Sequence, residues 1–409
     1  MADRTRVFIQ ATGRRIAPFD DPIGETLILN RPLQEWQAEA LAAGGFEVSP
    51  TLEPPCLVVP DTFFASAGAL RAFVDGARGD DAVLVLKHSE FATMTTPVHP
   101  DIREVDGGYL FEAIRFVSGR DRAPRHVVVD PHERVLNMHL PAQFTGVEEM
   151  KIGLPRDPVM TLDHWVHILW LNLLAPGYEI RAAPVRQSAA QILGALVRAR
   201  SVNRWKVARE IGVQGARCNI HRTATVEASI LGDDVTIGPY ARVFFSRVGN
   251  GATVASGADV ELAVLGDRSH VSAHSLVRFS VLYPGAAVSP FLQLGVLGRD
   301  AVVAGASMRD LNVQQAVRVE LDGQLYSTGQ RFLGSALGHR SELGSGVALA
   351  TGRSVPNDYV VVTDPEYVLA DIPPGLEGQG PLVIEGGSLR PLRRQAATSP
   401  AAAPAPATE

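Results

Sequence analysis

Few residues of this chain have the type and spacing that catalysis or metal binding requires. Lysine is nearly absent, because Lys87, Lys151 and Lys206 are the only three, so chemistry that needs an ammonium group has few candidates. The two cysteines, Cys56 and Cys218, lie far apart and not at a spacing typical of metal ligands. We therefore expect two reduced, partly buried thiols, and neither a disulfide nor a zinc site.

The length and charge of the chain exclude several function classes. At 409 residues it is long enough for two domains, each with its own core. A formal net charge of -6 does not favour a nucleic-acid-binding protein. No signal-like apolar segment follows Met1, and the most apolar helical stretch, residues 165–175, is about half as long as the roughly twenty residues of a membrane span. The sequence predicts a cytoplasmic protein without a membrane span.

Runs of strand length alternate with helical patterns in the first 130 residues. The strands are expected at 6–10, 56–60, 82–87, 109–117 and 126–130. Helical periodicity is found at 32–43 and 65–77. This alternation predicts a Rossmann-like, mostly parallel sheet with helices on its faces, and a ligand site at the carboxyl ends of the strands.

The second half of the chain is periodic between residues 220 and 303. Three interleaved aliphatic series repeat every 17 residues: Val226, Val243, Val260, Val277 and Leu294; Leu231, Val248, Leu265 and Leu282; Ile237, Val254, Val271 and Val288. The pattern predicts a three-sided left-handed parallel β-helix, in which each strand turns one aliphatic side chain inward and successive coils stack about 4.8 Å apart.

The predicted organisation has three parts. An α/β domain with a basic linker helix near 190–210 covers residues 1–212, and the β-helix covers 213–372 with an inserted loop or hairpin at about 311–332. Residues 373–409 form a C-terminal extension whose end, rich in Ala, Pro and Thr, is expected to be disordered.

The repeat region resembles the left-handed β-helix of hexapeptide-repeat acyltransferases and of sugar-nucleotide pyrophosphorylases. The coil from Leu231 to Val243 looks particularly like the pyrophosphorylase type. The resemblance covers about a third of the chain and implies the fold but not an activity, because some such helices are only scaffolds. It also implies a homo-oligomer, a trimer or a dimer, which would cover the open strand edges.

The N-terminal part resembles sugar-1-phosphate nucleotidylyltransferases, with a degenerate motif. Their first strand leads into a loop G-x-G-T-R-L-x-P, which Gly13, Arg15 and Pro18 match, whereas Ala11 and Arg14 replace the first glycine and the threonine. Residues 30–41 resemble the start of the family's first helix. Residues 57–64 resemble the strand whose aspartate binds magnesium, which here is Asp61.

This resemblance implies transfer of a nucleoside monophosphate to a sugar phosphate, a reaction that depends on alignment and charge neutralisation. Gly13, Arg14 and Arg15 would bind the nucleotide, with Arg15 as the catalytic arginine. Asp61 would hold Mg²⁺.

One expected cation is missing from this motif, because Ile23 stands where the family has a lysine. Loss of a cation beside a triphosphate should cost several kcal/mol of transition-state stabilisation, as the loss of one oxyanion-hole donor costs about 3 kcal/mol. Arg14 is placed to compensate in part. Asp163 is the other carboxylate available for a metal, although it matches the family pattern poorly.

Acyl transfer on the β-helix is the other chemistry that the resemblance implies. Such acyltransferases use an outward histidine between subunits as general base. His270 and His274 bracket Val271, and His274 falls at an outward position where Glu261 can orient it. His221 and His339 lie nearer the ends of the helix.

Two functions remain open from the sequence. The first is a sugar-nucleotide-linked transferase of cell-surface polysaccharide metabolism, acting by acyl transfer or by an impaired nucleotidyl transfer. The second is a non-catalytic regulatory or scaffold subunit that binds a nucleotide, a sugar nucleotide or a catalytic homologue.

Overall fold

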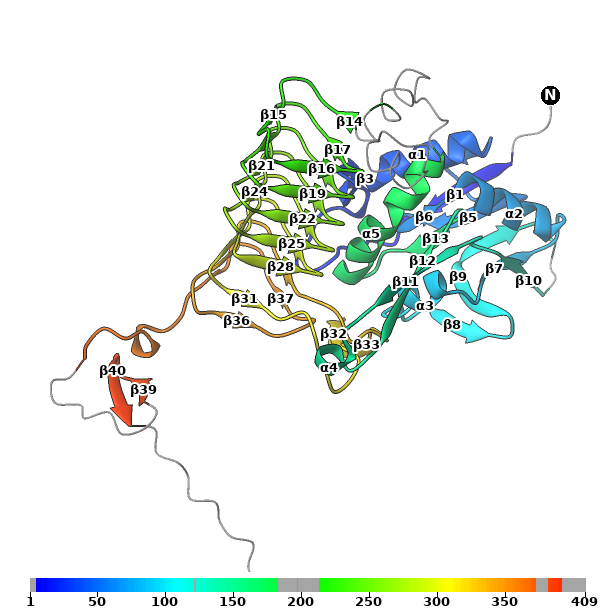
Figure 1. The fold of residues 1–409 in the computed structure, drawn as a ribbon. Coiled ribbons are helices and arrows are strands. Elements are labelled where there is room, and N and C mark those ends of the chain that lie inside the picture. Colours follow the sequence, from blue (N-terminus) through cyan, green and yellow to red (C-terminus); the bar gives the residue numbers. More distant parts are fainter. Residues whose placement is uncertain (1–4, 121–122, 183–196, 198–212, 373–381, 392–409) are drawn as a thin grey trace, which may run out of the picture. The chain divides into compact units, whose positions relative to one another are not determined.

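The computed structural model describes residues 5–120, 123–182, 197, 213–372 and 382–391. The chain forms two compact units, Met1–Val361 and Val362–Glu409 (Figure 1). The smaller unit contains the 3-10 helix η2 (Pro365–Tyr367) and a hairpin of β39 (Leu382–Glu385) and β40 (Ser388–Pro391). Among the described helices, none is both long enough and apolar enough to span a membrane. The predictions of a basic helix near 190–210 and of a disordered end concern residues that lie almost entirely outside the described ones.

A seven-stranded mixed sheet forms the centre of the N-terminal part. Its order is β10-β7-β9-β5-β1-β4, with β8 paired to β9. The strands are β1 (Arg6–Gln10), β4 (Glu47–Ser49), β5 (Cys56–Pro60), β7 (Ala82–Lys87), β8 (Ile102–Val105), β9 (Gly108–Val117) and β10 (Arg125–Val129). All five predicted strands form. The sheet is less parallel than predicted, because β9 leaves a tight hairpin with β8 and runs antiparallel to both β5 and β7.

Five helices accompany this sheet: α1 (Leu33–Ala43), α2 (Ala67–Ala77), α3 (Glu90–Thr95), α4 (Ala142–Thr145) and α5 (Trp165–Ala182). The Ser66 hydroxyl caps α2 by accepting a hydrogen bond from the Ala69 N–H, and Ser89 caps α3 in the same way at Ala92. The first eleven residues of α5 are almost entirely buried, as predicted for residues 165–175. A helix that is apolar on all sides belongs inside a protein, and α5 packs in the core that both halves of the larger unit share.

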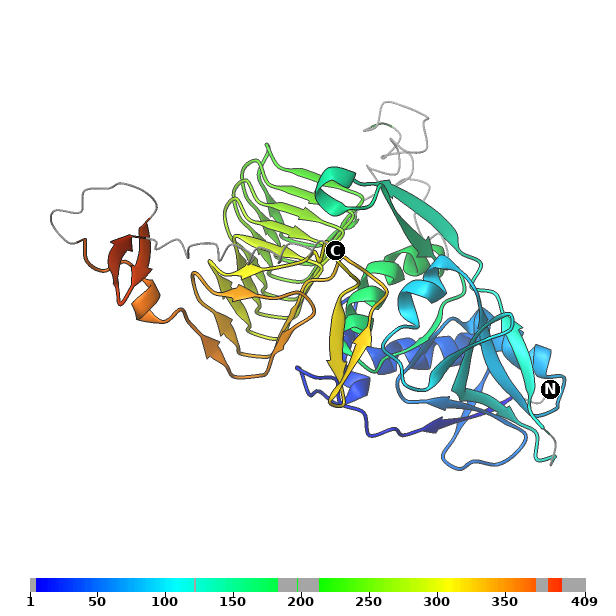
Figure 2. The same cartoon turned by 90° about the horizontal axis from the view of Figure 1, so that it is seen from below.

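Shorter elements connect these parts. They are η1 (Ile23–Glu25), β2 (Leu27–Ile28), β3 (Arg31–Pro32), β6 (Phe63–Ala65), β11 (Arg134–His139), β12 (Glu149–Leu154) and β13 (Val159–Thr161). Strands β11 and β12 form an antiparallel hairpin that leads, through α4 at its tip, toward the β-helix in both views (Figures 1 and 2).

The second half is a left-handed parallel β-helix, which confirms the predicted fold. The first face contains β14 (Val213–Gln214), β17 (Ile230–Leu231), β20 (Arg247–Val248), β23 (Val264–Leu265), β26 (Val281–Leu282), β29 (Val296–Leu297), β34 (Ala336–Leu337) and β37 (Ser354–Val355). The second contains β15 (Asn219–Ile220), β18 (Thr236–Ile237), β21 (Thr253–Val254), β24 (His270–Val271), β27 (Ala287–Ser289), β30 (Val302–Ala304), β35 (Glu342–Leu343) and β38 (Val360–Val361). The third contains β16 (Thr225–Glu227), β19 (Arg242–Phe244), β22 (Asp259–Glu261), β25 (Leu276–Arg278) and β28 (Phe291–Gln293), and β31 (Ser307–Met308) pairs with β36 (Ala348–Leu349).

The predicted inward positions are correct except for one. Val260 pairs with Val277 in register, and both side chains are fully buried. The partner of Val277 in the next coil is Leu292, not the predicted Leu294. Leu292 follows Val288 by four positions, whereas Val277 follows Val271 by six. This coil is therefore two residues shorter than the preceding one. Leu294 consequently lies at a corner with a φ of 52°.

A hairpin of β32 (Arg318–Leu321) and β33 (Gln324–Ser327) interrupts the coils between β31 and β34. It lies between the β-helix and the N-terminal part (Figure 2). Val319 and Leu321 enter the same hydrophobic core as α5. The coils then resume and end at β38, close to the predicted end of the helix.

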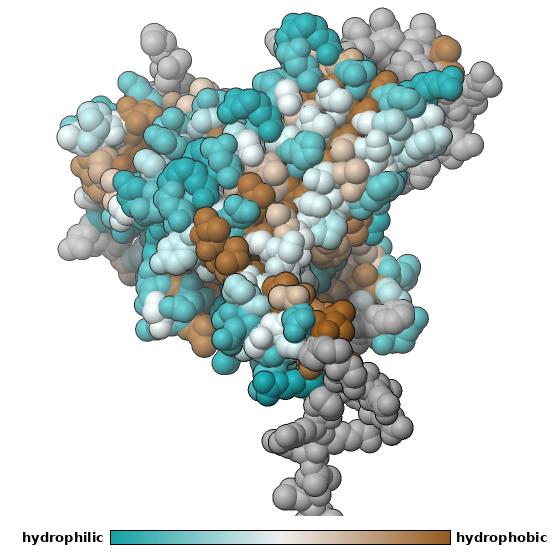
Figure 3. Space-filling model, turned by 90° about the vertical axis from the view of Figure 1, so that its left-hand side faces the viewer, coloured by the Kyte–Doolittle hydropathy of each residue, from teal (hydrophilic) through white to brown (hydrophobic). Residues whose placement is uncertain are grey.

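The N-terminal part and the first face of the β-helix pack directly against each other. Val264, Val281 and Tyr283 project from this face into the core that contains α5. The Leu27 N–H donates to the Tyr283 hydroxyl at 3.2 Å, and the Asn30 amide donates to the Leu265 carbonyl at 2.8 Å. The view in Figure 3 shows a different surface, where apolar side chains are scattered among polar ones.

A partly buried ionic cluster, the Asp21 clasp, joins the same two parts. The Asp21 carboxylate accepts hydrogen bonds from Arg299 Nη1 at 2.7 and 2.8 Å and pairs with His339 Nε2 at 3.1 Å. His339 Nδ1 accepts the Arg299 backbone N–H at 2.7 Å, which places the imidazole proton on Nε2, facing Asp21. In this tautomer the Asp21 carboxylate accepts hydrogen bonds from both Arg299 and His339.

Candidate functional site at the carboxyl edge of the sheet

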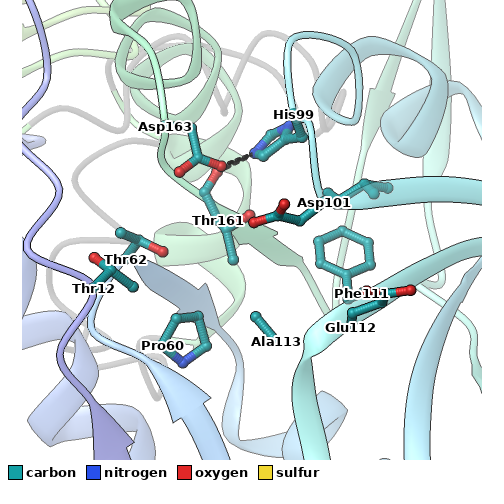
Figure 4. Close-up of a pocket in the computed structure, with 11 residues that line it drawn as sticks. Thr12, Pro60, Thr62, His99, Asp101, Phe111, Glu112, Ala113, Thr161 and Asp163 are labelled. Atoms are coloured by element: carbon teal, nitrogen blue, oxygen red, sulfur yellow. Dashed lines mark hydrogen bonds and ion pairs between the residues drawn. The ribbon is translucent and has the colours of Figure 1, made fainter. Parts of the chain in front are cut away.

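A small cavity of about 50 Å³ opens where parallel strands β1 and β5 end. This is the edge at which sheets of this kind bind ligands. Figure 4 shows its side chains, most of which carry oxygen atoms. The lining residues are Thr12, Pro60, Thr62, His99, Asp101, Ile102, Phe111, Glu112, Ala113, Thr161 and Asp163.

The loop after β1 is held in place by Asp61. One carboxylate oxygen, Oδ1, accepts hydrogen bonds from the Thr12 backbone N–H at 3.1 Å and the Thr12 hydroxyl at 2.6 Å. Gly13 then adopts a φ of 68°, a conformation that glycine reaches without strain, and a side chain there would meet nothing within 4 Å. Gly13 and Asp61 thus lie in adjoining segments.

The two arginines of the loop have different surroundings. Arg14 bridges two carboxylates, with Nε 3.2 Å from Asp163 and Nη1 2.9 Å from Asp322 at the tip of the β32–β33 hairpin. Arg15 is 56 % exposed and donates to the Asp20 carbonyl at 2.5 Å. Arg14, and not Arg15, is therefore in contact with a residue that lines the cavity.

Three histidines beside the cavity were not predicted from the sequence. The rings of His99 and His167 stack with centroids 3.8 Å apart. His99 Nε2 lies 2.9 Å from the Thr161 carbonyl and 3.5 Å from an Asp163 carboxylate oxygen. His167 Nδ1 accepts the backbone N–H groups of Asp163 and His164, at 3.0 and 3.1 Å, and so caps the start of α5.

Burial keeps two of these histidines uncharged. It lowers the pKa of His164 to about 4, and it lowers the pKa of His167 well below its ordinary value. A neutral imidazole can hold backbone groups and orient a carboxylate, but it cannot supply positive charge to a phosphate. The sequence signal for these histidines is their closeness to Asp163, which His164 follows directly and His167 follows by four positions.

Position 23, where the sequence motif leads one to expect a lysine, lies in apolar surroundings in the structure. Ile23 is 7 % exposed and packs in the core of the N-terminal part. No group of three or more His, Cys, Asp or Glu able to hold a metal ion exists within the described ranges. Both carboxylates contact the loop after β1: Asp61 accepts hydrogen bonds from Thr12, and Asp163 pairs with Arg14.

His274 lies on the opposite half of the larger unit, at an exposed corner of the β-helix with a φ of 56°. A Cβ at Gly257, one coil earlier, would lie 2.5 Å from His274 Nδ1, so the imidazole stacks on that glycine. Glu261, expected to orient His274, instead pairs with Arg242 at 3.1 Å and Arg278 at 3.3 Å.

The other histidines of the β-helix differ in exposure. His270 is exposed on β24, and His221 Nδ1 lies 2.8 Å from the Thr223 hydroxyl. His339 is buried in the Asp21 clasp.

Comparisons with known proteins show no family for this chain. Neither a protein-family model nor a curated protein sequence matches this chain. Among solved structures, a Bacillus cereus protein assigned as an acetyltransferase matches 35 % of this chain and 78 % of its own, at 11 % identity and a TM-score of 0.16. The polysialic acid O-acetyltransferase OatWY matches 46 % of this chain and 94 % of its own, at 17 % identity and a TM-score of 0.18.

Proposed function

We propose that the N-terminal part binds a nucleotide or sugar nucleotide at the carboxyl edge of its sheet and turns it over poorly by nucleotidyl transfer. The observation that supports this most directly is the state of Arg14, which two carboxylates already neutralise at 3.2 and 2.9 Å. With Ile23 buried as well, the loop lacks the surplus positive charge that stabilises a triphosphate in its transition state. The β-helix would then be the assembly scaffold of a protein in cell-surface polysaccharide metabolism.

Magnesium fits this proposal as a companion of the nucleotide. Only Oδ1 of Asp61 is engaged by Thr12, so Oδ2 is available as a single carboxylate ligand. Mg²⁺ commonly binds through one or two carboxylates together with substrate phosphates. We therefore expect Mg²⁺ to bind with the nucleotide and not alone, and to offset the negative charge of the cavity.

Thermal unfolding with and without ligands tests the proposal. Nucleoside triphosphates and sugar nucleotides, each with about 5 mM Mg²⁺, should raise the midpoint of thermal unfolding by several degrees at saturating concentration. A ligand present at about 100 times its Kd contributes roughly 2.7 kcal/mol to the free energy of unfolding. Asp61→Asn should abolish the shift, and the exposed Asp234→Asn on the β-helix should not. A wild-type protein without any shift, or one with rapid pyrophosphate exchange, would contradict the proposal.

Introduction of a lysine at position 23, where Ile23 replaces the family's cation, is a weak test of the proposal in this structure. Ile23 belongs to the core, so Ile23→Lys would bury an ammonium group and destabilise the fold before it could help catalysis. Asp322→Asn is the better change, because it releases one of the two carboxylates from Arg14 at an exposed position.

Acyl transfer at His274 is a second candidate function. The ring is exposed and makes no hydrogen bond or ion pair with any described residue, so a general base there has access to solvent and substrate. His274→Ala should remove acyl-coenzyme A consumption, whereas His270→Ala, on the exposed side of the preceding strand β24, should retain it. A wild-type protein that consumes no acyl-coenzyme A across a panel of sugar nucleotides would exclude this function.

We also propose that the protein is a homo-oligomer, a trimer or a dimer, formed through the β-helix. A monomer mass by light scattering at micromolar concentration would refute it.

A further inference from the structure

The cavity where β1 and β5 end, here called the carboxyl-edge cavity, contains two buried threonines whose hydroxyl groups have no partner. Thr62 and Thr161 line it and are 3 % and 6 % exposed. Among the described residues, none forms a hydrogen bond with either hydroxyl. In Figure 4 the Thr62 hydroxyl points toward the middle of the cavity. Because a buried hydroxyl without a partner destabilises a fold, both groups are placed to bind something that enters the cavity.

Carboxylates surround these hydroxyls, and no lysine or arginine is among the lining residues. Asp101, Glu112 and Asp163 all line the cavity. Glu112 and Asp163 each pair with an arginine that lies outside it. Asp101 is exposed and forms no hydrogen bond or ion pair with any described residue. At least one negative charge at the cavity is therefore left without a cation from the protein.

The histidine of the cavity offers no hydrogen-bonding group to a ligand. Both ring nitrogens of His99 lie against backbone carbonyl oxygens, that of Thr96 at 3.1 Å and that of Thr161 at 2.9 Å. The hydrogen-bonding groups of His99 are thus occupied by the protein itself. What remains for a ligand is a set of carboxylate and hydroxyl oxygens, so the ligand has to bring the hydrogen-bond donors.

The size and charge of the cavity define the group that fits it. A water molecule needs about 10–15 Å³, so a cavity of about 50 Å³ holds a single polar substituent and not a sugar ring. A metal ion held by the protein alone is a poor occupant, because within the described ranges no group of three or more His, Cys, Asp or Glu is placed to hold one. A primary ammonium group matches better, since its three N–H donors correspond to two hydroxyls and one carboxylate. Its charge also offsets that of Asp101, and the low-dielectric walls formed by Phe111 and Pro60 strengthen this attraction.

We propose that the carboxyl-edge cavity binds a primary ammonium group, held by Asp101 and by the hydroxyls of Thr62 and Thr161. This inference rests on the proposed function and narrows it, because the sugar phosphate or sugar nucleotide that binds at this edge then carries a free amino group. The phosphate lies at the loop after β1, and the amino group enters the cavity beside it. A hydroxyl in the same place brings one donor and no charge, and an acetylated nitrogen has neither the charge nor the small size.

Calorimetric titration of the full chain with sugar phosphates and Mg²⁺ tests the proposal. Glucosamine 1-phosphate, glucose 1-phosphate and N-acetylglucosamine 1-phosphate share the ring and the phosphate, so the ratios of their affinities isolate one substituent. Glucosamine 1-phosphate should bind about tenfold more tightly than glucose 1-phosphate, the effect of one charge-assisted hydrogen bond. N-acetylglucosamine 1-phosphate should bind no more tightly than glucose 1-phosphate. The absence of saturable binding by glucosamine 1-phosphate would overturn the proposal, even if nucleotides bind.

Two aspartates that flank β8 provide a matched pair of variants. Asp101 directly precedes the strand and Asp106 directly follows it, and both are exposed, but only Asp101 lines the cavity. Asp101→Asn should reduce the preference for the amino sugar to about twofold, because the charge of the partner is lost. Asp106→Asn should leave the preference at its wild-type value.

Thr62→Val separates a role in binding from a role in folding. It should lower the preference about threefold by removing one acceptor, and it should leave the urea midpoint at or above that of the wild type, because no hydrogen bond within the protein is lost. A lower midpoint would contradict the assignment of Thr62 as a hydroxyl without a partner.

The affinity ratios also distinguish this proposal from the proposed function. Equal affinity for the amino and hydroxyl sugars, or a preference that survives both Asp101→Asn and Thr62→Val, would overturn the ammonium site and leave nucleotide binding in place. An amino-sugar preference that responds to these variants, in a protein that nucleotides do not stabilise, would support the ammonium site and refute nucleotide binding.

Discussion

Removal of the Asp21 charge should weaken the contact between the N-terminal part and the β-helix more than any comparable surface change. The Asp21 side chain is 16 % exposed. Its two carboxylate oxygens accept hydrogen bonds from Arg299 Nη1 at 2.7 and 2.8 Å, and one of them lies 3.1 Å from His339 Nε2. Hydrogen bonds to charged groups contribute about 1.5–3 kcal/mol each. Arg299 is 32 % exposed and regains water when the partner is lost. We therefore expect Asp21→Asn to cost about 2 kcal/mol of unfolding free energy.

The same change should alter the acid sensitivity of the fold. Burial by itself raises the pKa of Asp21, but the hydrogen bonds from His339 and Arg299 and the charge of Arg299 lower it, with a net result below the ordinary 3.8. A carboxyl with a depressed pKa stabilises the folded state fully above its unfolded value and ceases to do so as the pH falls through its folded value. Wild-type stability should consequently fall more steeply below about pH 4 than that of Asp21→Asn.

Urea unfolding at pH 7 and at pH 3.5 (about the ordinary carboxyl value) measures both effects. With a slope of about 2 kcal/mol per molar urea, the midpoint of Asp21→Asn should lie about 1 M below the wild type at pH 7. Asp20→Asn is the matched control, because the Asp20 side chain is 68 % exposed and lies 3.9 Å from Arg15. Equal midpoints for the two variants would show that the clasp contributes no more than a surface ion pair and would refute this reasoning.

Three further outcomes follow from individual side chains. Leu282→Ala, at a fully buried inward position, should cost about 2–5 kcal/mol by urea unfolding, whereas Leu325→Ala, 57 % exposed on β33, should change stability by less than about 0.5 kcal/mol. Asp322→Asn should leave stability within about 1 kcal/mol and increase nucleotide affinity up to about fivefold by calorimetry, because it frees Arg14 from one carboxylate. Since burial lowers the pKa of His164 to about 4, the unfolded state takes up a proton first on acidification. Stability should therefore fall by a few kcal/mol from about pH 6.5 to pH 4, and less in His164→Gln.

The β-helix could be predicted because its stability depends on a repeated local condition. Each coil must place an aliphatic side chain at the same three inward points, and parallel stacking keeps these points in register, as at Val243, Val260 and Val277. Extrapolation of the period is wrong only where a coil loses two residues. Leu292 then takes the inward position, while Leu294 lies at a corner with a φ of 52°. Periodicity cannot reveal such a change, because both residues are leucines.

The N-terminal site was predictable only where its residues are close in sequence to a strand. Gly13 and Asp61 follow predicted strands, so their neighbourhood could be inferred from sheet geometry. The partners of Arg14 could not, because Asp163 is 149 residues away and Asp322 is 308 residues away. His99 contacts the Thr161 carbonyl, which is 62 residues away, and the Asp163 carboxylate through the packing of α5, which no local pattern encodes.

The distant origin of Asp322 has a consequence for how the two halves affect each other. Asp322 belongs to the hairpin inserted in the β-helix, and Arg14 belongs to the loop that we propose to approach phosphate. A phosphate that binds Arg14 must compete with the Asp322 carboxylate. The two anions share one positive charge, so each weakens the attraction of the guanidinium for the other. Asp322 is 66 % exposed, so water replaces its ion pair at little cost, whereas the backbone of its hairpin stays anchored by buried Val319 and Leu321. Nucleotide binding should therefore release the tip of the hairpin without separating the β-helix from the sheet.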